Sequence, residues 1–268
     1  SEIDKKRANA NIVMGRFLYA LKQDTDYEII SYEGGQKDNA ITREAVCEIL
    51  VAREDIEAVK ACAAKAEKGI REEYAGTDSN ITVQITEEGY AETDVLHPTS
   101  REKVLFYLVQ IPFGIQKMSG NIEGLVETST NIGIVKLSDD EFFASSSVRS
   151  SVEAARDALS DKIQYLTEFL GGEFEIQGAY PAWEYRKDSP LRDKMVSVYE
   201  EMYGQKPEVV AIHAGLECGL FYKKIEGLDC VSLGPNMKGI HTSEEVLDIA
   251  STERVWNYIV KVLEQLKD

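Results

Sequence analysis

The feature that most constrains the fold is an order of predicted elements that occurs twice in the first two thirds of the sequence. Apolar residues at helical spacing predict helices, and alternating or β-branched runs predict strands. The first copy comprises a helix over 8–22, a strand over 24–32, a strand from 44, a helix over 55–74 and a strand over 80–87. About 90 residues later, the same order returns over 103–111, 125–137, 141–150, 152–170 and 173–177. The copies share this order without evident sequence identity.

This order restricts how both copies can pack. A helix and a strand each need a second layer against which to bury their apolar side, so helices on one face of an antiparallel sheet are the natural arrangement. The sequence therefore predicts an α+β domain over 1–182, built from two αββαβ units with antiparallel sheets. A capping box at Thr99-Ser100-Arg101-Glu102 is expected to begin the first helix of the second unit.

The pattern changes after Pro181 and the polar run 184–189. Ser189 and Pro190 suit the N-cap and the first position of a helix. A strand over 208–212, a helix from 215, a strand over 230–233 and a last helix ending at 266 follow. This alternation predicts an α/β segment with a parallel component over 183–268, and so short a sheet needs cover on both faces from a larger domain.

The composition excludes several classes of protein. A formal charge of −17 and a pI near 4.7 oppose binding to nucleic acid, which is a polyanion. No apolar run is long enough to span a bilayer, and no secretory signal opens the sequence. The four cysteines form no Cys-x-x-Cys pair, which excludes a zinc ribbon and favours reduced thiols in a cytoplasmic protein.

Residues 211–249 concentrate histidine, cysteine and glycine in one part of the chain. AIHAGLECGLF and SLGPNMKGIHTSEEVLDI contain two of the three histidines. Together with EIDKKRANAN, GGQKDNAITREA, LVETSTNIGIV, VRSS and GAYPAWE, they resemble the bacterial aminoacyl-histidine dipeptidases, in the zinc peptidase clan of the carnosinases, peptidase T and carboxypeptidase G. The resemblance extends over the whole chain. It implies that 1–182 is the lid domain and that 183–268 is the C-terminal portion of the catalytic domain.

The resemblance also implies an activity. Its members are cytosolic metal-dependent dipeptidases that hydrolyse unblocked dipeptides such as Xaa-His with zinc-activated water. A site for two zinc ions needs several ligands around both metals, and only His241 matches a metal ligand of the family. The other ligands and the glutamate general base belong to an N-terminal catalytic portion that is expected to be missing from this sequence. The 268 residues alone are therefore expected to contain no catalytic residue and to be inactive.

The same resemblance makes four residues candidates for substrate binding. The Asn39 amide can donate to a developing oxyanion or hold a peptide carboxylate, and the Arg149 guanidinium suits the free carboxylate of a dipeptide. His213 and Glu217 are the other two. Each has a structural alternative: a turn asparagine beside Gly-Gly, a strand-end arginine paired with an acid, and a hydrogen-bonded pair at i, i+4. Asn131, in VETSTN, fits an ordinary strand edge.

Two other functions are compatible with the sequence. A related exopeptidase or deacylase of the same clan would cleave a tripeptide or an acyl-amino acid, and the shape of the lid would decide. A non-catalytic binding or dimerising module is the other alternative, because exposed sheet edges can pair across an interface. The expected partners are a dipeptide substrate, the N-terminal catalytic portion and a second copy in a homodimer, with neither nucleic acid nor membrane.

Overall fold

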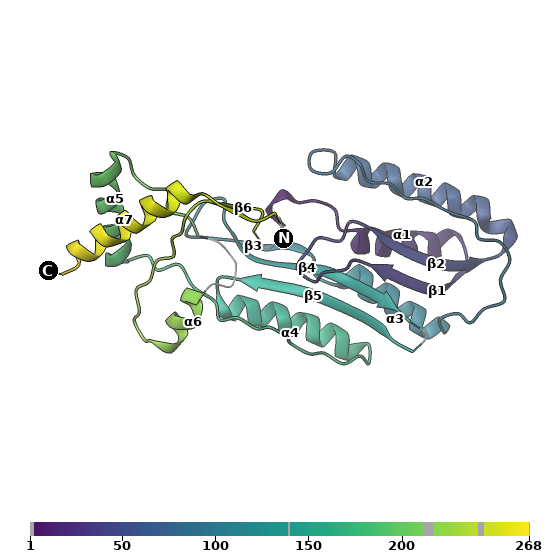
Figure 1. Cartoon of the computed structure of the whole chain (residues 1–268). Helices are drawn as coiled ribbons and strands as arrows, with labels where there is room; N and C mark the ends of the chain where they lie inside the picture. Colours follow the sequence, from purple (N-terminus) through teal and green to yellow (C-terminus); the bar gives the residue numbers. More distant parts are fainter. Residues whose placement is uncertain (1–2, 139, 212–216, 241–243, 268) are drawn as a thin grey trace. The chain divides into compact units, whose positions relative to one another are not determined.

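The computed structural model describes the chain except for residues 1–2, 139, 212–216, 241–243 and 268 (Figure 1). The chain divides into two compact units, Ser1–Gln177 and Gly178–Asp268. The first unit ends at Gln177, whereas the sequence places the end of the first domain at 182. Each unit is described separately below.

The first unit is built on one antiparallel sheet of five strands. These are β1 (Tyr27–Gly34), β2 (Ala45–Val51), β3 (Gly114–Met118), β4 (Val126–Leu137) and β5 (Phe142–Ser150). The long strand β4 organises the sheet, because β5 pairs with it along one edge while β1 and β3 share the other edge. β2 then pairs with the outer edge of β1.

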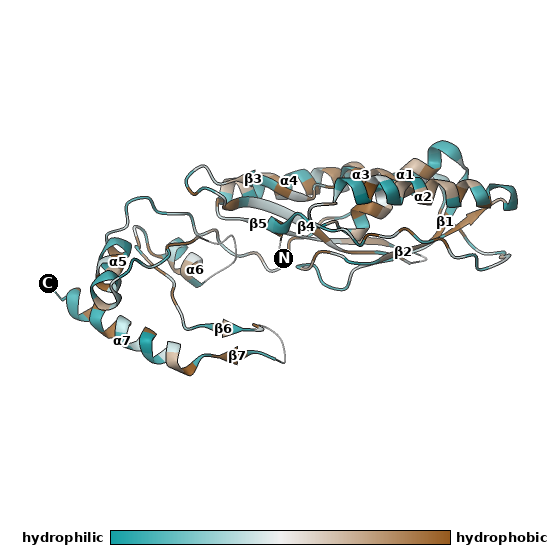
Figure 2. Cartoon of the chain, turned by 90° about the horizontal axis from the view of Figure 1, so that it is seen from above, coloured by the Kyte–Doolittle hydropathy of each residue, from teal (hydrophilic) through white to brown (hydrophobic). Residues whose placement is uncertain are grey.

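Four helices cover one face of this sheet (Figure 2). They are α1 (Ala10–Asp24), α2 (Ile56–Glu73), α3 (Pro98–Gln110) and α4 (Glu153–Phe169), with short 3₁₀ turns at Ile3–Lys5 and Arg53–Asp55. The core lies between helices and sheet, where Leu18, Ile29, Leu108, Ile132 and Val135 are almost fully buried. Burial of such side chains contributes about 1.5–3 kcal/mol each, so this layer is the main source of stability.

The predicted repeat is confirmed for its first four elements and wrong in two other respects. Helix, strand, strand and helix recur as α1-β1-β2-α2 and α3-β4-β5-α4, with β3 inserted in the second copy. The copies do not form separate sheets, however, since β1 pairs with β4 and α1 packs against α3. The third strand of each copy, predicted over 80–87 and 173–177, is absent. The first unit is therefore one continuous sandwich rather than two αββαβ units.

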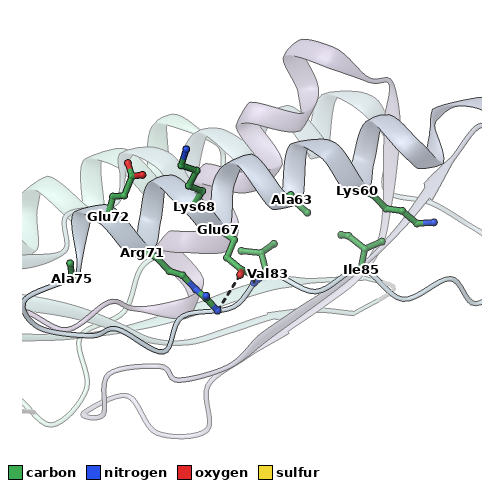
Figure 3. Close-up of a pocket in the computed structure, with 10 residues that line it drawn as sticks. Lys60, Ala63, Glu67, Lys68, Arg71, Glu72, Ala75, Val83 and Ile85 are labelled. Atoms are coloured by element: carbon green, nitrogen blue, oxygen red, sulfur yellow. Dashed lines mark hydrogen bonds and ion pairs between the residues drawn. The ribbon is translucent and has the colours of Figure 1, made fainter.

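Residues 80–87 illustrate why alternation alone misleads. Ile81, Val83 and Ile85 are half-buried as the pattern predicts. The backbone of this segment, however, hydrogen-bonds to side chains of helix α2. The Glu67 carboxylate accepts the Val83 amide at 2.8 Å, and the Arg71 Nε donates to the Ile81 carbonyl at 2.6 Å. Figure 3 shows Glu67 and Arg71 pointing from α2 toward this segment. Side chains of α2 thus replace the neighbouring strand that a ladder would require.

Helix α3 begins two residues earlier than the predicted capping box indicates. His97 is its N-cap, with Nδ1 accepting the Thr99 amide at 3.2 Å, and Pro98 occupies the first helical position. Thr99 consequently lies inside the helix, and the predicted capping box at Thr99-Ser100-Arg101-Glu102 is wrong. The Glu102 carboxylate instead pairs with Lys22.

The second unit consists mainly of helices. They are α5 (Pro190–Tyr203), α6 (Glu217–Lys224) and α7 (Ile249–Gln265), with a two-residue antiparallel ladder between β6 (Met237–Lys238) and β7 (Val246–Leu247). The predicted start of α5 is confirmed, because the Ser189 hydroxyl accepts the Arg192 amide and Pro190 follows. Helices α5 and α7 pack on each other through Met195, Val198, Tyr258 and Val262.

The predicted α/β character of the second unit is not observed in the residues that the structure describes. Neither 208–211 nor 230–233 forms a strand, and no parallel pairing occurs there. A parallel strand needs apolar cover on both faces. The described part of this unit buries four core side chains, which is too small a layer to provide that cover.

Candidate functional site

Asn39 lies at the tip of the connection between β1 and β2, where its side chain is exposed to solvent. The connection leaves the sheet after Gly34 and turns at residues 38–40 before β2 begins at Ala45. Gly35 adopts a positive φ of 79°, a backbone conformation that a side chain disfavours. The loop therefore begins with a glycine turn at the end of a buried strand.

The loop rests directly on the backbone of β4. A side chain at Gly35 would collide with the Gly133 carbonyl, and one at Gly133 would collide with the carbonyls of Lys37 and Asp38. Gly133 lies where the register between β4 and β5 shifts, between Ile132 and Ile134. Such an irregularity bends a strand locally. The absence of side chains at both glycines lets two backbones approach each other, which places the Asn39 turn against the middle of β4.

Two buried asparagines fix the turn to β4. The Asn131 amide donates to the carbonyls of Ala40 at 2.8 Å and Asp38 at 3.2 Å, on either side of Asn39. Its oxygen accepts from the Asn9 amide at 3.0 Å, and Asn9 also donates to the Ile132 carbonyl at 2.8 Å. Both asparagines are almost completely buried. A buried polar group left unpaired costs about 1–3 kcal/mol, so this network strongly favours a single position of the turn.

Thr42 and Asn11 complete the network. The Thr42 hydroxyl lies 2.9 Å from the Gly133 carbonyl and accepts from the Asn11 amide at 3.1 Å. The Asn11 oxygen accepts from the Tyr32 hydroxyl at 3.1 Å. These side chains occupy an edge of β4, between the stretch that pairs with β1 and the stretch that pairs with β3. Polar side chains thus satisfy carbonyls that a neighbouring strand would otherwise bond.

Arg149 lies near the end of β5, close to the same stretch of β4. It pairs with Ser129, and the next pair on the same face is Asn131 with Ser147. Residues two apart on a strand point to one face, so Arg149 and the Asn131 that holds the Asn39 turn share a face of the sheet. Arg149 is half-buried, and its guanidinium makes no hydrogen bond or ion pair with any residue that the structure describes. Its guanidinium is therefore available to an external carboxylate.

The other predicted site residues lie in the second unit. Glu217 is the first residue of α6 and is exposed. His213 and His241 lie outside the described residues, so the predicted His213–Glu217 pair and the predicted zinc ligand stay predictions. In the described part of the chain, no three His, Cys, Asp or Glu side chains are grouped closely enough to hold a metal ion. No described helix is both long and apolar enough to cross a membrane.

Comparisons with known proteins relate this chain to peptidases. The family model of a peptidase dimerisation domain, from the M20 peptidases, matches residues 1–78. The cytosol non-specific dipeptidase of Escherichia coli strain K12 is 30% identical over 265 residues, which are 99% of this chain and 54% of that protein. The crystal structure of the aminoacylhistidine dipeptidase from Vibrio alginolyticus superposes with a TM-score of 0.88 at 31% identity, over 97% of this chain and 53% of that one.

Over nearly its whole length, this chain is therefore similar to dipeptidases of the M20 family. The resemblance to that family seen in the sequence is thus confirmed, although the chain spans about half the length of the relatives that it matches. The match to the dimerisation domain covers α1, β1, β2 and α2, which is the first copy of the repeat. The Asn39 loop lies within this matched region.

Several residues that organise the candidate site were not predicted from the sequence. Asn131 was expected at a strand edge, whereas it is buried beneath the Asn39 turn. Asn9 and Asn11 stand in the ANAN segment at the start of α1, and two asparagines spaced by one residue at a helix start are the available signal. Asn9 is in fact the N-cap of α1, since its side chain accepts the amides of Asn11 and Ile12.

Proposed function

We propose that this chain provides the lid, over 1–182, and the C-terminal portion of the catalytic domain, over 183–268, of a dipeptidase that cleaves unblocked dipeptides such as Xaa-His. Two relatives that match nearly all of the chain are named dipeptidases, and one is named for aminoacyl-histidine substrates. The chain's cytosolic relative supports a cytoplasmic location. The activity belongs to the whole protein and not to these residues alone.

The observation that carries the proposal is the pairing of a fixed Asn39 turn with an unpaired Arg149 at one stretch of β4. An amide held in position donates to an oxyanion as negative charge develops on the peptide oxygen. A guanidinium binds a carboxylate through two parallel hydrogen bonds, and a dipeptide has a free carboxylate. Together they supply one donor for the reacting carbonyl and one anchor for the end of the substrate. Glu217 and His213 are proposed to add substrate contacts from the second unit.

The proposed metal is zinc, two ions in the complete site, with His241 as one ligand. Zinc, when bound, polarises the peptide carbonyl and lowers the pKa of a bound water. A neutral imidazole suits such a metal. The remaining ligands and the general base are proposed to come from outside these 268 residues.

The match to a peptidase dimerisation domain supports a further proposal, a homodimer formed through the first unit. The sheet leaves its β2 edge without a neighbouring strand among the described residues, and an edge of this kind can pair with another chain. A purely dimerising role is the second candidate function. It differs from the first in requiring no substrate.

A substrate panel tests the proposal. The complete protein is assayed with zinc on an Xaa-His dipeptide, its N-acetylated form, a tripeptide and an acyl-amino acid. We expect efficient hydrolysis of the free dipeptide and at least about tenfold lower kcat/KM for the others, because each loses a charge-assisted contact or does not fit beneath the lid. Preference for the tripeptide or the acyl-amino acid would assign the related exopeptidase or deacylase activity. A dimer without turnover of any substrate would assign the dimerising role.

A further inference from the structure

Two cysteines that are distant in sequence meet in the second unit. Cys218 is the second residue of α6, and Cys230 lies in the extended segment that leads toward β6. The Cys230 thiol is 3.9 Å from the Cys218 carbonyl oxygen. Both side chains are half-buried, so both are within reach of small reagents. The first unit contains the other two cysteines, Cys47 and Cys62.

The two cysteines share one local environment in the second unit. Desolvation, together with the neighbouring Cys218 thiol, raises the pKa of Cys230 to about 11, while a hydrogen bond from Trp183 acts against the increase. The start of α6 is packed tightly here, since a side chain at Gly219 would approach the Pro181 carbonyl to 2.9 Å. The pair thus sits in a close-packed corner formed by α6, the segment 181–183 and the segment before β6.

We propose that Cys218 and Cys230 form a reversible intramolecular disulfide when a peroxide is present. One thiolate attacks hydrogen peroxide, the O–O bond breaks, and a sulfenic acid and hydroxide form. The second thiolate then attacks the sulfenic sulfur, the S–O bond breaks, and the S–S bond forms with release of hydroxide. The two sulfurs lose two electrons, the peroxide gains them, and the two thiol protons and two hydroxides become two waters.

The consequence is a covalent link between two segments that only non-covalent contacts join in the reduced protein. The disulfide would tie the first turn of α6, where Glu217 lies, to the segment that leads to β6. Intramolecular disulfides in reducing compartments are usually transient and respond to oxidants. The inference concerns thiol chemistry and does not depend on the proposed dipeptidase activity.

Tryptophan fluorescence can report the reaction. The chain contains two tryptophans, Trp183 beside the Cys230 thiol and Trp256, which is 67% exposed on α7. In a Trp256→Phe background, the remaining emission comes from Trp183. Formation of the disulfide replaces a thiol next to the indole by a disulfide, so the emission is expected to change on oxidation and to return with dithiothreitol.

The test treats the folded chain with hydrogen peroxide, counts free thiols and maps linked peptides by mass spectrometry. We expect two of the four thiols to disappear, a peptide pair joining Cys218 to Cys230, and full recovery on reduction. Cys218→Ser and Cys230→Ser should each abolish the linked pair and the Trp183 response. Cys47→Ser, at a half-buried thiol of the first unit, should leave both intact.

A second variant, Cys230→Ala, guards against misfolding of the serine variant, and circular dichroism verifies that each variant is folded. The proposal is overturned if folded wild-type protein keeps four thiols under peroxide, or if the lost thiols become sulfinic acids without a linked pair. It is equally overturned if the linkage joins separate chains, which non-reducing electrophoresis detects as a concentration-dependent dimer.

Discussion

The two units differ in how their interiors are built. The first buries a large apolar cluster between four helices and a sheet, and it also buries the polar network of Asn9, Asn11 and Asn131. The second buries four core side chains and leaves Ile249, Trp256 and Leu263 of α7 largely exposed. A sheet with helices on one face forms a complete layer by itself, whereas two packed helices do not. The first unit is therefore expected to be the more stable one.

Polar contacts have different roles in the two units. In the first unit they lie inside and position a loop, as Asn131 does for the turn at Asn39. In the second they are partly buried and hold helix starts: the Asp229 carboxylate accepts from the Ser189 hydroxyl and the Leu191 amide, and Asp248 accepts the Ser251 amide. The more completely a polar contact is buried, the more its removal costs.

The largest expected effect is on the first core. Leu18→Ala should lower the free energy of unfolding of the first unit by about 3–5 kcal/mol, because it leaves a cavity in a close-packed layer. Val198→Ala in the second unit should lower it by about 2 kcal/mol. Both tryptophans belong to the second unit, so their fluorescence follows that unit while far-UV circular dichroism follows both. Urea unfolding measured with both probes separates the effects.

The control for the core prediction is Leu263→Ala, at a side chain that is 57% exposed, which should change stability by no more than about 0.5 kcal/mol. Equal losses for Leu18→Ala in both probes would show that the two units unfold as one, and the comparison would fail.

The next effect separates the support of the loop from its function. Asn131→Ala should lower stability by about 2–3 kcal/mol, because the carbonyls of Asp38 and Ala40 and the amide of Asn9 lose their partner. Asn39→Ala, on the exposed tip of the same loop, should leave stability within about 0.5 kcal/mol and lower kcat of the complete enzyme about 10²-fold. Denaturant titration and steady-state kinetics measure the two quantities. A stability loss for Asn39→Ala that equals that of Asn131→Ala would assign Asn39 a structural role.

A smaller effect concerns acid sensitivity of the second unit. Desolvation tends to raise the pKa of Asp229, but hydrogen bonds from the Ser189 hydroxyl and the Leu191 amide, with the charges of Arg186 and Arg192, lower it below 3.8. A carboxyl whose folded pKa is depressed stabilises the fold above its unfolded pKa, and this contribution is lost as the pH falls through the folded pKa.

The second unit should therefore become less stable as the pH falls below about 4, and Asp229→Asn should reduce that dependence. Tryptophan fluorescence during denaturation at pH 6 and pH 3 measures the change. Asp193→Asn, at an exposed carboxylate of α5, is the matched control. Identical pH dependence of stability for Asp229→Asn and wild type would show that Asp229 does not cause the acid sensitivity of the second unit.

Much of the first unit could be predicted because its helices and strands follow from patterns among residues close together in the sequence. The spacing of apolar residues predicts α1, and the β4–β5 hairpin follows from two strands joined by a short polar turn. The network under Asn39 could not be predicted, because it joins residues 9–11, 38–42 and 131–133, which only the folded sheet brings together. The failed strand at 80–87 has a related cause, since Glu67 and Arg71 compete for its backbone.

The second unit was harder to predict for a different reason. Alternating elements indicate an α/β fold only where a sheet has partners on both sides, and local pattern cannot reveal whether those partners are present. The start of α5 at Ser189 and Pro190 was predictable because a cap involves neighbouring residues alone. The proposed roles of His213, Glu217 and His241 rest on the resemblance alone.

The most direct test of the central claim, that Arg149 receives the carboxylate of a free dipeptide, is a comparison of two substrates in one variant. The kcat/KM of wild type and Arg149→Met is measured in the complete enzyme for an Xaa-His dipeptide and for its C-terminal amide. Loss of a charge-assisted contact of about 1.5–3 kcal/mol predicts a fall of roughly 10- to 150-fold for the free dipeptide, with little change for the amide. An equal fall for both substrates, or no fall for either, would contradict the account.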